Sequence, residues 1–309
     1  MELPNVKDYK LTPGMKVHEL VEQMLNAGFQ ATEIGRAVEI IERMKKNGAT
    51  IFLSFTANMV AAGLRGVFAL LAKKKFVDVI ITTGGAIDHD VIKSISSYII
   101  GRFDMDDIDL HKRGINRLGN ILIPNDRYVA FENVIQNILS EIYEEKRVIT
   151  PSELIMEIGK RMKDESSFIY WAYVNKIPIF CPGITDSALG LQVFFFKQTH
   201  KDFIIDVTGD MKELADIVFD AKSTGGIILG GGIAKHYTIG VNLLRGGLDY
   251  AVYITTAQPW DGSLSGARTT EAISWGKISE KANHVTISGE ATVIFPLIII
   301  KVFEDLKIW

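Results

Sequence analysis

Hydrophobic and polar residues alternate along this chain with two different periods. Two segments within residues 18–48 repeat apolar side chains every three or four positions, which predicts amphipathic helices, and Gly48 would end the second. Residues 49–56 and 76–85 hold short apolar runs without polar alternation. Such runs predict strands that are covered on both faces. Residues 63–75, between these two strands, again have the helical period.

The alternation of helix and strand patterns continues through the second half of the chain. Helices are predicted at residues 168–176, 211–224 and 236–247 and from residue 271 onward, and strands at residues 177–182, 202–208, 225–232, 249–257 and 283–289. Strands separated by helices favour a parallel, doubly wound sheet. The predicted fold is therefore α/β, with a single, mostly parallel, Rossmann-like sheet as one structural unit at residues 49–309. A helical N-terminal extension would occupy residues 1–48.

Two long apolar stretches could be mistaken for membrane spans. Residues 51–72 contain Asn58 and Arg65 and are broken by glycines, so we interpret them as a buried strand, a turn and a helix. Residues 293–303 are too short to span, since a helix needs about 20 apolar residues to cross a bilayer. They predict a core helix near the C-terminus, and no membrane association is expected.

The composition is typical of a globular protein, with 47% hydrophobic and 23% charged residues among 309. The formal net charge is -3, without the clustered basic face that a nucleic-acid-binding protein would need. The single cysteine, Cys181, permits no intramolecular disulfide, and the polar N-terminus "MELPNVKDYK" lacks the apolar core of a signal peptide. Both features fit a cytoplasmic protein. The histidines and the cysteine show no zinc spacing, so no structural metal is expected.

Four predicted strand ends carry unusual residue types, and we expect them to converge on one crevice. They read "SFTANMVAAG", "TTGGAIDHD", "ILGGGIAKHY" and "ITTAQPWDGSLSGA". In doubly wound sheets, ligands bind beyond the carboxyl ends of the strands. The glycines at 84–85 and 230–232 would let a phosphate approach the backbone N–H groups at helix starts. Neither run matches the dinucleotide fingerprint, and a single such turn is more often only a tight turn, but two in one crevice favour a nucleotide.

Several titratable residues follow these strand ends, and each allows two interpretations. His236 could bond the backbone at a helix start, or it could donate or accept in a pocket. Asp88, His89 and Asp90 could be helix N-caps, the usual case, or could face a cationic substrate. Asp186 is placed similarly after its strand.

Lys277, in the stretch "EAISWGK", is the most informative lysine. It could be a solvated side chain beside Trp275 near the start of a helix. If it is instead buried, it could be a free amine that attacks an imine or a carbonyl and forms a Schiff base. Glu271 and Trp275 are four residues apart and share a helix face, where an acid and an aromatic ring could hold an organic cation.

These stretches together resemble the deoxyhypusine synthase family. The similarity runs from "GFQATEIGRAVEI" to "ATVIFPLIII" and is strongest in "VDVIITTGG", "RLGNILIPNDRY", "SFIYWAYVNKIP", "GGIILGGGIAKH", "DYAVYITTAQ", "DGSLSGA" and "EAISWGKI". The resemblance implies a homotetramer, a dimer of dimers with active sites shared across tight dimer interfaces, and tightly bound NAD. It implies transfer of the aminobutyl group of spermidine to one lysine of the translation factor 5A precursor, through a covalent imine on an enzyme lysine.

The resemblance also implies roles for individual residues. Lys277 would be the nucleophile, and His236 would lie beside the amine pocket. The other positions implied for the amine pocket are Glu271, Trp275, Asp261, Gly262 and Ser263, with Asp88 and His89 where the family usually has two glutamates. The positions implied for the cofactor are Thr83, Gly84, Gly85, Asp186, Gly231, Thr256, Ala257, Gln258 and Ala291, with Glu290 in place of the usual aspartate.

Some positions depart from the family pattern. Ala57 and Ala61 replace serines near the cofactor, and Leu191 and Leu264 replace acids that grip the amine ends. An unpaired ammonium in an apolar pocket is costly, so the amine could be shorter or differently charged, or could pair with other acids. A related enzyme with a small-amine acceptor, of the homospermidine synthase type, is the second hypothesis. A family member that has lost catalysis and serves as a binding subunit is the third, although the retained Lys277 argues against it.

Overall fold

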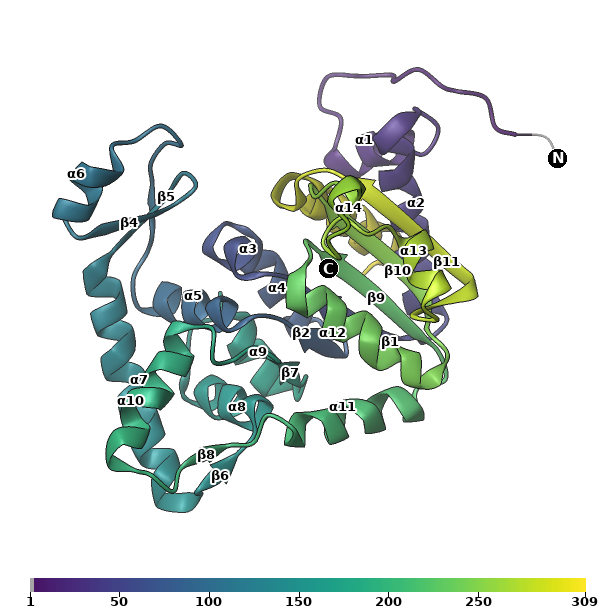
Figure 1. Ribbon diagram of the computed structural model, residues 1–309. Coiled ribbons are helices and arrows are strands. Elements are labelled where there is room, and N and C mark those ends of the chain that lie inside the picture. Colours follow the sequence, from purple (N-terminus) through teal and green to yellow (C-terminus); the bar gives the residue numbers. More distant parts are fainter. Residues whose placement is uncertain (1–2) are drawn as a thin grey trace. The chain divides into compact units, whose positions relative to one another are not determined.

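The computed structural model describes residues 3–309 (Figure 1). These residues divide into two compact units. Unit 1 comprises residues 3–55, 76–81 and 214–309, and unit 2 comprises residues 56–75 and 82–213. The N-terminal helices therefore belong to the same unit as the C-terminal third of the chain. This division differs from the predicted boundary at residue 48.

A parallel sheet forms the centre of unit 1. Its strands run in the order β11-β10-β9-β1-β2, and each neighbouring pair is parallel. Their bounds are β1 (Thr50–Ser54), β2 (Val79–Ile81), β9 (Thr224–Leu229), β10 (Leu248–Thr255) and β11 (Ile278–Ser288). The predicted α/β fold with a mostly parallel sheet is confirmed. The chain moves outward in one direction from β1 to β2 and in the other from β9 to β11, so the strand order reverses between β1 and β9.

Helices cover both faces of this sheet. They are α1 (Val17–Met24), α2 (Phe29–Lys46), α12 (Gly232–Asn242), α13 (Thr269–Ser274) and α14 (Ala291–Leu306). On β9, Gly225 faces α2, because a Cβ placed there would lie 2.7 Å from the sulfur of Met44. Ile228 points the other way and packs against Ile239 of α12, as the two-residue period of a strand requires. Hence α2 and α12 lie on opposite faces, and the N-terminal helices are one cover of the sheet.

Unit 2 is mainly helical. Its helices are α3 (Ala57–Ala61), α4 (Leu64–Lys73), α5 (Gly84–Ile95), α6 (Asp107–Lys112), α7 (Asn125–Glu145), α8 (Pro151–Arg161), α9 (Phe168–Asn175) and α10 (Ala188–Thr199). Its short strands are β3 (Ile99–Ile100), β4 (Ile115–Leu118), β5 (Ile121–Pro124), β6 (Val148–Ile149), β7 (Ile179–Phe180) and β8 (Ile204–Ile205). Strands β3, β5 and β4 form an antiparallel sheet, and β6 pairs with β8. Helix α11 (Gly209–Asp220) carries the chain from unit 2 into unit 1.

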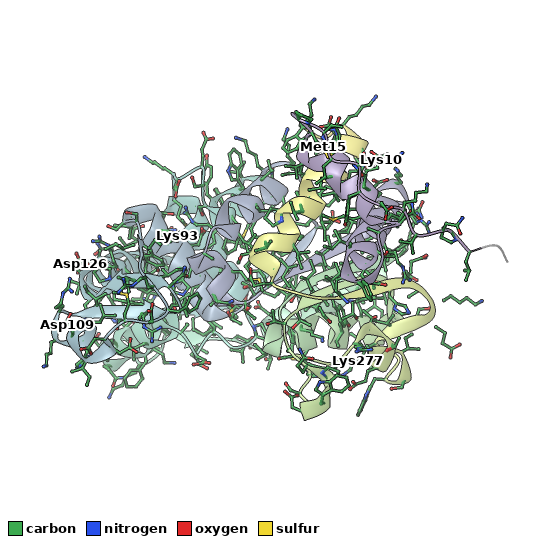
Figure 2. All side chains as sticks on the ribbon, turned by 90° about the horizontal axis from the view of Figure 1, so that it is seen from above. Lys10, Met15, Lys93, Asp109, Asp126 and Lys277 are labelled. Atoms are coloured by element: carbon green, nitrogen blue, oxygen red, sulfur yellow. The ribbon has the colours of Figure 1, made fainter. Side chains whose placement is uncertain are left out.

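Buried polar side chains hold the helices of unit 2 together. Arg65 of α4 donates from Nε to the carboxylate of Asp90 on α5 over 2.6 Å, and both side chains are almost fully buried. Asp90 also accepts from the hydroxyl of Ser167, which caps α9. Lys93, which is labelled in Figure 2, donates to three backbone carbonyls at the end of α3. Cys181 is fully buried after β7, and burial raises the pKa of its thiol to about 12.

The two apolar stretches form short elements as predicted, except that the short helix α3 stands where a turn was expected between the strand and the helix. Residues 51–72 form β1, α3 and most of α4, and residues 293–303 lie within α14. Across residues 3–309, every helix is either too short or too polar to cross a membrane.

Candidate active site

A cavity of about 330 Å³ lies in unit 1 between α12, α13 and the loop that precedes α13. Its wall includes five of the predicted amine-pocket residues: His236, Gly262, Glu271, Trp275 and Lys277. The size lies at the lower end of the range for small-molecule sites. The cavity therefore brings together residues from α12, from the loop and from the end of α13 that are up to 41 positions apart in the chain.

Lys277 follows a helix end, not a helix start as predicted. Helix α13 ends at Ser274, and Gly276 adopts a left-handed conformation with φ of 66°. The N–H of Gly276 donates to the carbonyl of Ile273 over 2.8 Å, and that of Lys277 donates to the carbonyl of Ala272 over 3.0 Å. This pair of bonds is a Schellman motif, in which glycine is the preferred left-handed residue. The carbonyl of Lys277 also accepts from Leu248 at the start of β10 over 3.1 Å, so its backbone is fixed on both sides.

The side chain of Lys277 turns toward a histidine and an aromatic ring. Its Nζ lies 3.3 Å from Nε2 of His236 and 5.2 Å from the centre of the Trp275 ring (Figure 2 labels Lys277). Burial, and then the nearby charge of Lys277, lower the pKa of His236. A neutral imidazole can accept a proton at Nε2 when its proton is on the other nitrogen. The pair is thus arranged for proton transfer between an amine and an imidazole.

Glu271 supplies a carboxylate to this cavity, and the loop before α13 supplies its rim. The carboxylate of Asp261 accepts from the N–H of Ser263 over 2.6 Å, across Gly262, which has φ of 70°. Asp261 and Ser263 therefore shape the turn that brings Gly262 to the cavity. Their predicted contact with the substrate stays a prediction.

Three polar residues of the cavity were not singled out from the sequence: Lys235, Tyr253 and Arg268. Lys235 is only 1% exposed, and its Nζ lies 4.4 Å from the centre of the Tyr253 ring. The sequence signal for Lys235 was weak: it is a charged residue directly before His236, on a helix that also buries the polar residues Thr238 and Asn242. Tyr253 occupies an inward position of β10 and left no comparable signal.

Part of the predicted cofactor set lies at the carboxyl ends of three neighbouring strands of unit 1. Gly231 follows β9, residues 256–258 (Thr256, Ala257 and Gln258) follow β10, and Glu290 and Ala291 follow β11. Glu290 caps α14 by accepting from the N–H of Thr292 over 3.1 Å. The strand order reverses next to β9, which is where ligands bind in open α/β sheets.

Two features of this edge fit a nucleotide. A Cβ at Gly232, the first residue of α12, would meet nothing within 4 Å, so a ligand can approach the backbone there, beside the bond from the N–H of Gly232 to Oγ of Ser265. Ser54, at the end of β1, is fully buried, and its Oγ has no hydrogen-bond partner among residues 3–309. Such orphaned polar atoms are rare and call for a ligand or a water molecule.

The other predicted cofactor residues belong to unit 2. Thr83 precedes α5, and its buried Oγ1 has no partner within the described chain. The backbone at Gly84 lies close to Ser187, the residue next to Asp186, because a Cβ at Gly84 would lie 2.4 Å from Cβ of Ser187. Gly85 similarly faces Ala57. Unit 2 therefore gathers Thr83, Gly84 and Asp186 around the starts of α5 and α10.

Asp88 and His89 both make contacts within unit 2, and their predicted contact with a substrate stays a prediction. Both carboxylate oxygens of Asp88 accept from the N–H groups of Ala188 and Leu189, at 2.8 and 2.9 Å, so Asp88 caps α10. Burial raises the pKa of Asp88 to about 6, although these two bonds oppose the shift. Nδ1 of His89 lies 2.8 Å from the hydroxyl of Tyr98, and burial lowers the pKa of His89 to about 4.

The two leucines that depart from the family pattern lie in different units. Leu264 lines the cavity and packs against the apolar cluster below it. Leu191 lies on α10 and is 49% exposed. The cavity wall at Leu264 is therefore apolar, and Glu271 is the carboxylate among its described lining residues.

Comparison with known proteins adds family membership to this geometry. The sequence model described as deoxyhypusine synthase matches residues 19–302. A probable deoxyhypusine synthase from Pyrococcus furiosus is 47% identical over 300 residues, covering 92% of this chain and 89% of the relative. A second one, from Picrophilus torridus, is 48% identical over 296 residues, covering 95% of each chain.

A solved structure agrees with these sequence relatives. The crystal structure named as a deoxyhypusine synthase from Entamoeba histolytica superposes with a TM-score of 0.73 at 29% identity and covers 97% of both chains. The match spans both units, including the strand ends and the cavity described above. This chain belongs to the deoxyhypusine synthase family, whose members are transferases.

Proposed function

We propose that this protein uses NAD to transfer the aminobutyl group of spermidine to one lysine of the translation factor 5A precursor. The observation that carries the proposal is the placement of Lys277 Nζ 3.3 Å from His236 Nε2 in a cavity that Glu271 and Trp275 also line. Family membership supports the substrate and the reaction class. A homotetramer with shared active sites is part of the same proposal.

The residues of this chain supply binding and proton transfer. Glu271 and the ring of Trp275 attract an ammonium group by charge and by cation–π contact. His236 accepts the proton of Lys277, which leaves a free amine able to attack the imine carbon of the oxidised substrate. That attack expels 1,3-diaminopropane and leaves the four-carbon amine as an imine on Lys277. The acceptor lysine then displaces Lys277, and His236 returns the proton.

NAD, when bound, would accept a hydride from spermidine and give it back at the end. Gly231, Gly232 and the start of α12 would hold a phosphate, and Glu290 and Ala291 lie at the end of the outer strand, β11. In unit 2, Thr83, Gly84 and Asp186 are the corresponding candidates. The orphaned hydroxyl groups of Ser54 and Thr83 support a polar ligand near each set.

The deciding experiment traps the covalent intermediate. The protein is incubated with NAD and spermidine, reduced with borohydride, digested and analysed by mass spectrometry. A butylamine adduct on the peptide carrying Lys277, absent in Lys277→Arg, is the expected result. Full transfer activity in Lys277→Ala, or no adduct with any amine tested, would refute the mechanism and favour a binding subunit without catalysis.

Leu264 favours a second candidate, a related transferase with a different amine. The apolar wall at this position offers no acid to an ammonium group, so the donor or the acceptor could be a smaller amine. Radiolabelled spermidine offered with either the translation factor 5A precursor or putrescine separates the two. Label in protein and none in polyamine would exclude a homospermidine-type enzyme.

A further inference from the structure

Lys235 is a buried lysine in the wall of the cavity, and the reaction described above does not use it. It is 1% exposed, and its Nζ donates to the backbone carbonyl of Ala267 over 2.6 Å. The ammonium also lies 4.4 Å from the centre of the Tyr253 ring, within the range of a cation–π contact. Burial lowers the pKa of Lys235 to about 8, while the charge of Glu271 opposes the shift. A lysine is rarely buried so completely without a carboxylate bonded to it.

The bond to Ala267 joins α12, which carries His236, to the residues directly before α13, which carries Glu271. Lys235 precedes His236 on α12. Ala267 directly precedes Arg268, the N-cap of α13, and the N–H of Glu271 donates to the carbonyl of Arg268 over 3.1 Å. The position of Glu271 relative to α12 therefore depends on the position of Ala267. A second link between α12 and this loop, from the N–H of Gly232 to the hydroxyl of Ser265 over 3.0 Å, is exposed to water and so weaker.

We propose that Lys235 is a positioning residue that ties the start of α13 to α12 and so sets the distance between Glu271 and His236 across the cavity. The inference rests on the proposed function, because it assigns Glu271 to the binding of the donor amine. Lys277 follows α13 and has one further anchor on the sheet, since its carbonyl accepts from the N–H of Leu248 at the start of β10. Loss of the Lys235 bond is thus expected to weaken amine binding more than it displaces the nucleophile.

A positioning role and a purely electrostatic role predict opposite changes in KM. Replacing Lys235 by methionine keeps the shape of the side chain and removes both the hydrogen bond and the charge. If Lys235 positions Glu271, KM for the amine rises about tenfold and kcat changes less than threefold, because small displacements of binding groups are costly. If Lys235 only adds positive charge to a site for cations, its removal relieves repulsion and KM falls.

Lys45 provides a matched control outside the cavity. Its Nζ donates to the carbonyl of Phe76 over 3.0 Å and lies 5.1 Å from the centre of the Phe76 ring. Lys45→Met therefore removes the same kinds of contact from α2, on the other face of the sheet. Both variants lower the melting temperature, and only Lys235→Met raises KM. An unchanged or lowered KM in Lys235→Met, or an equal rise in Lys45→Met, overturns the proposal.

Two further measurements keep the test decisive. Hydrogen–deuterium exchange of the segment 262–275 is expected to speed up at least tenfold in folded Lys235→Met and to stay unchanged in Lys45→Met. This readout needs no turnover, so it tests the tether even when wild-type protein forms no adduct, a result that would count against the proposed function alone. Lys235→Arg keeps a cationic donor and is expected to hold KM within threefold of wild type. A tenfold rise in that variant with normal exchange would contradict the tether.

Discussion

Replacing Gly276 by alanine tests whether the helix end positions Lys277. Gly276 has φ of 66°, a conformation that costs an alanine about 1–2 kcal/mol relative to the right-handed region. The new Cβ would lie 3.2 Å from Cδ1 of Leu243, the tip of a side chain that is 49% exposed and can move aside. The steric contact thus adds little, and the backbone conformation decides the cost.

Gly48 offers the same substitution in the same motif, away from the cavity. It follows the end of α2 and has φ of 65°. Its N–H donates to the carbonyl of Lys45, and the N–H of Ala49 donates to the carbonyl of Met44. A Cβ at Gly48 would meet nothing within 4 Å. Gly48→Ala and Gly276→Ala should therefore each lower the free energy of unfolding by about 1–2 kcal/mol. Each melting temperature should fall by about 2–8 °C.

The two variants should differ in catalysis. Alanine at position 276 favours a rearranged turn, which moves Lys277 away from His236, and a shift of about 1 Å at a reacting group can cost on the order of 100-fold in rate. We expect kcat for release of 1,3-diaminopropane from spermidine, at saturating NAD and well below the melting temperature, to fall at least tenfold in Gly276→Ala. Gly48→Ala should keep wild-type kcat. Equal kcat values in the two variants at matched loss of stability would refute the reasoning.

Three other predictions concern charge. The folded-state pKa of Asp88, about 6, lies above its ordinary value, so the stability that this group contributes is lost as the pH rises through the folded-state pKa. The advantage of wild type over Asp88→Asn in the free energy of urea unfolding should therefore shrink by about 2 kcal/mol between pH 4.5 and 7, and a constant difference would contradict a raised pKa. Arg65→Met leaves the fully buried Asp90 without its cation and should lower the free energy of unfolding in urea by about 3–5 kcal/mol. A decrease below about 1 kcal/mol would show that Asp90 does not depend on this ion pair. His236→Gln removes the proton acceptor of Lys277 and should lower kcat by about 10²–10⁴-fold. Because the pKa of His236 is lowered, wild-type activity should decline only below the usual titration range of histidine, and this acidic limb should disappear in the variant.

Local patterns in the sequence were sufficient for the regular elements. The apolar period at residues 63–75 predicted α4, and the run at residues 225–232 predicted β9. The hairpin of β4 and β5 was missed, although Gly119 and Asn120 between them are a typical two-residue turn. Its strands have only four residues each, which gives the alternation too little length to be distinctive.

The candidate site could be predicted only in part from local sequence patterns. Gly276 is a helix-ending signal, and using it would have placed Lys277 after α13. Residue similarity to the family placed His236, Glu271 and Trp275 in one pocket, and the structure brings them to one cavity. The bond of Lys235 to Ala267 spans 32 residues and depends on how two helices pack over β10, so no local pattern could reveal it.

The buried Cys181 makes this protein convenient for site-directed labelling. Thiolates react with maleimides and thiols do not, and the pKa of this thiol, about 12, leaves almost no thiolate at neutral pH. Since the chain has no other cysteine, each thiol introduced on its surface becomes the reactive one without further mutagenesis. Cysteines at Glu144 of unit 2 and Glu280 of unit 1, both exposed, would carry a donor and acceptor dye pair. The energy transfer between the dyes would then report, in real time, whether the distance between these two positions changes when NAD or an amine is added.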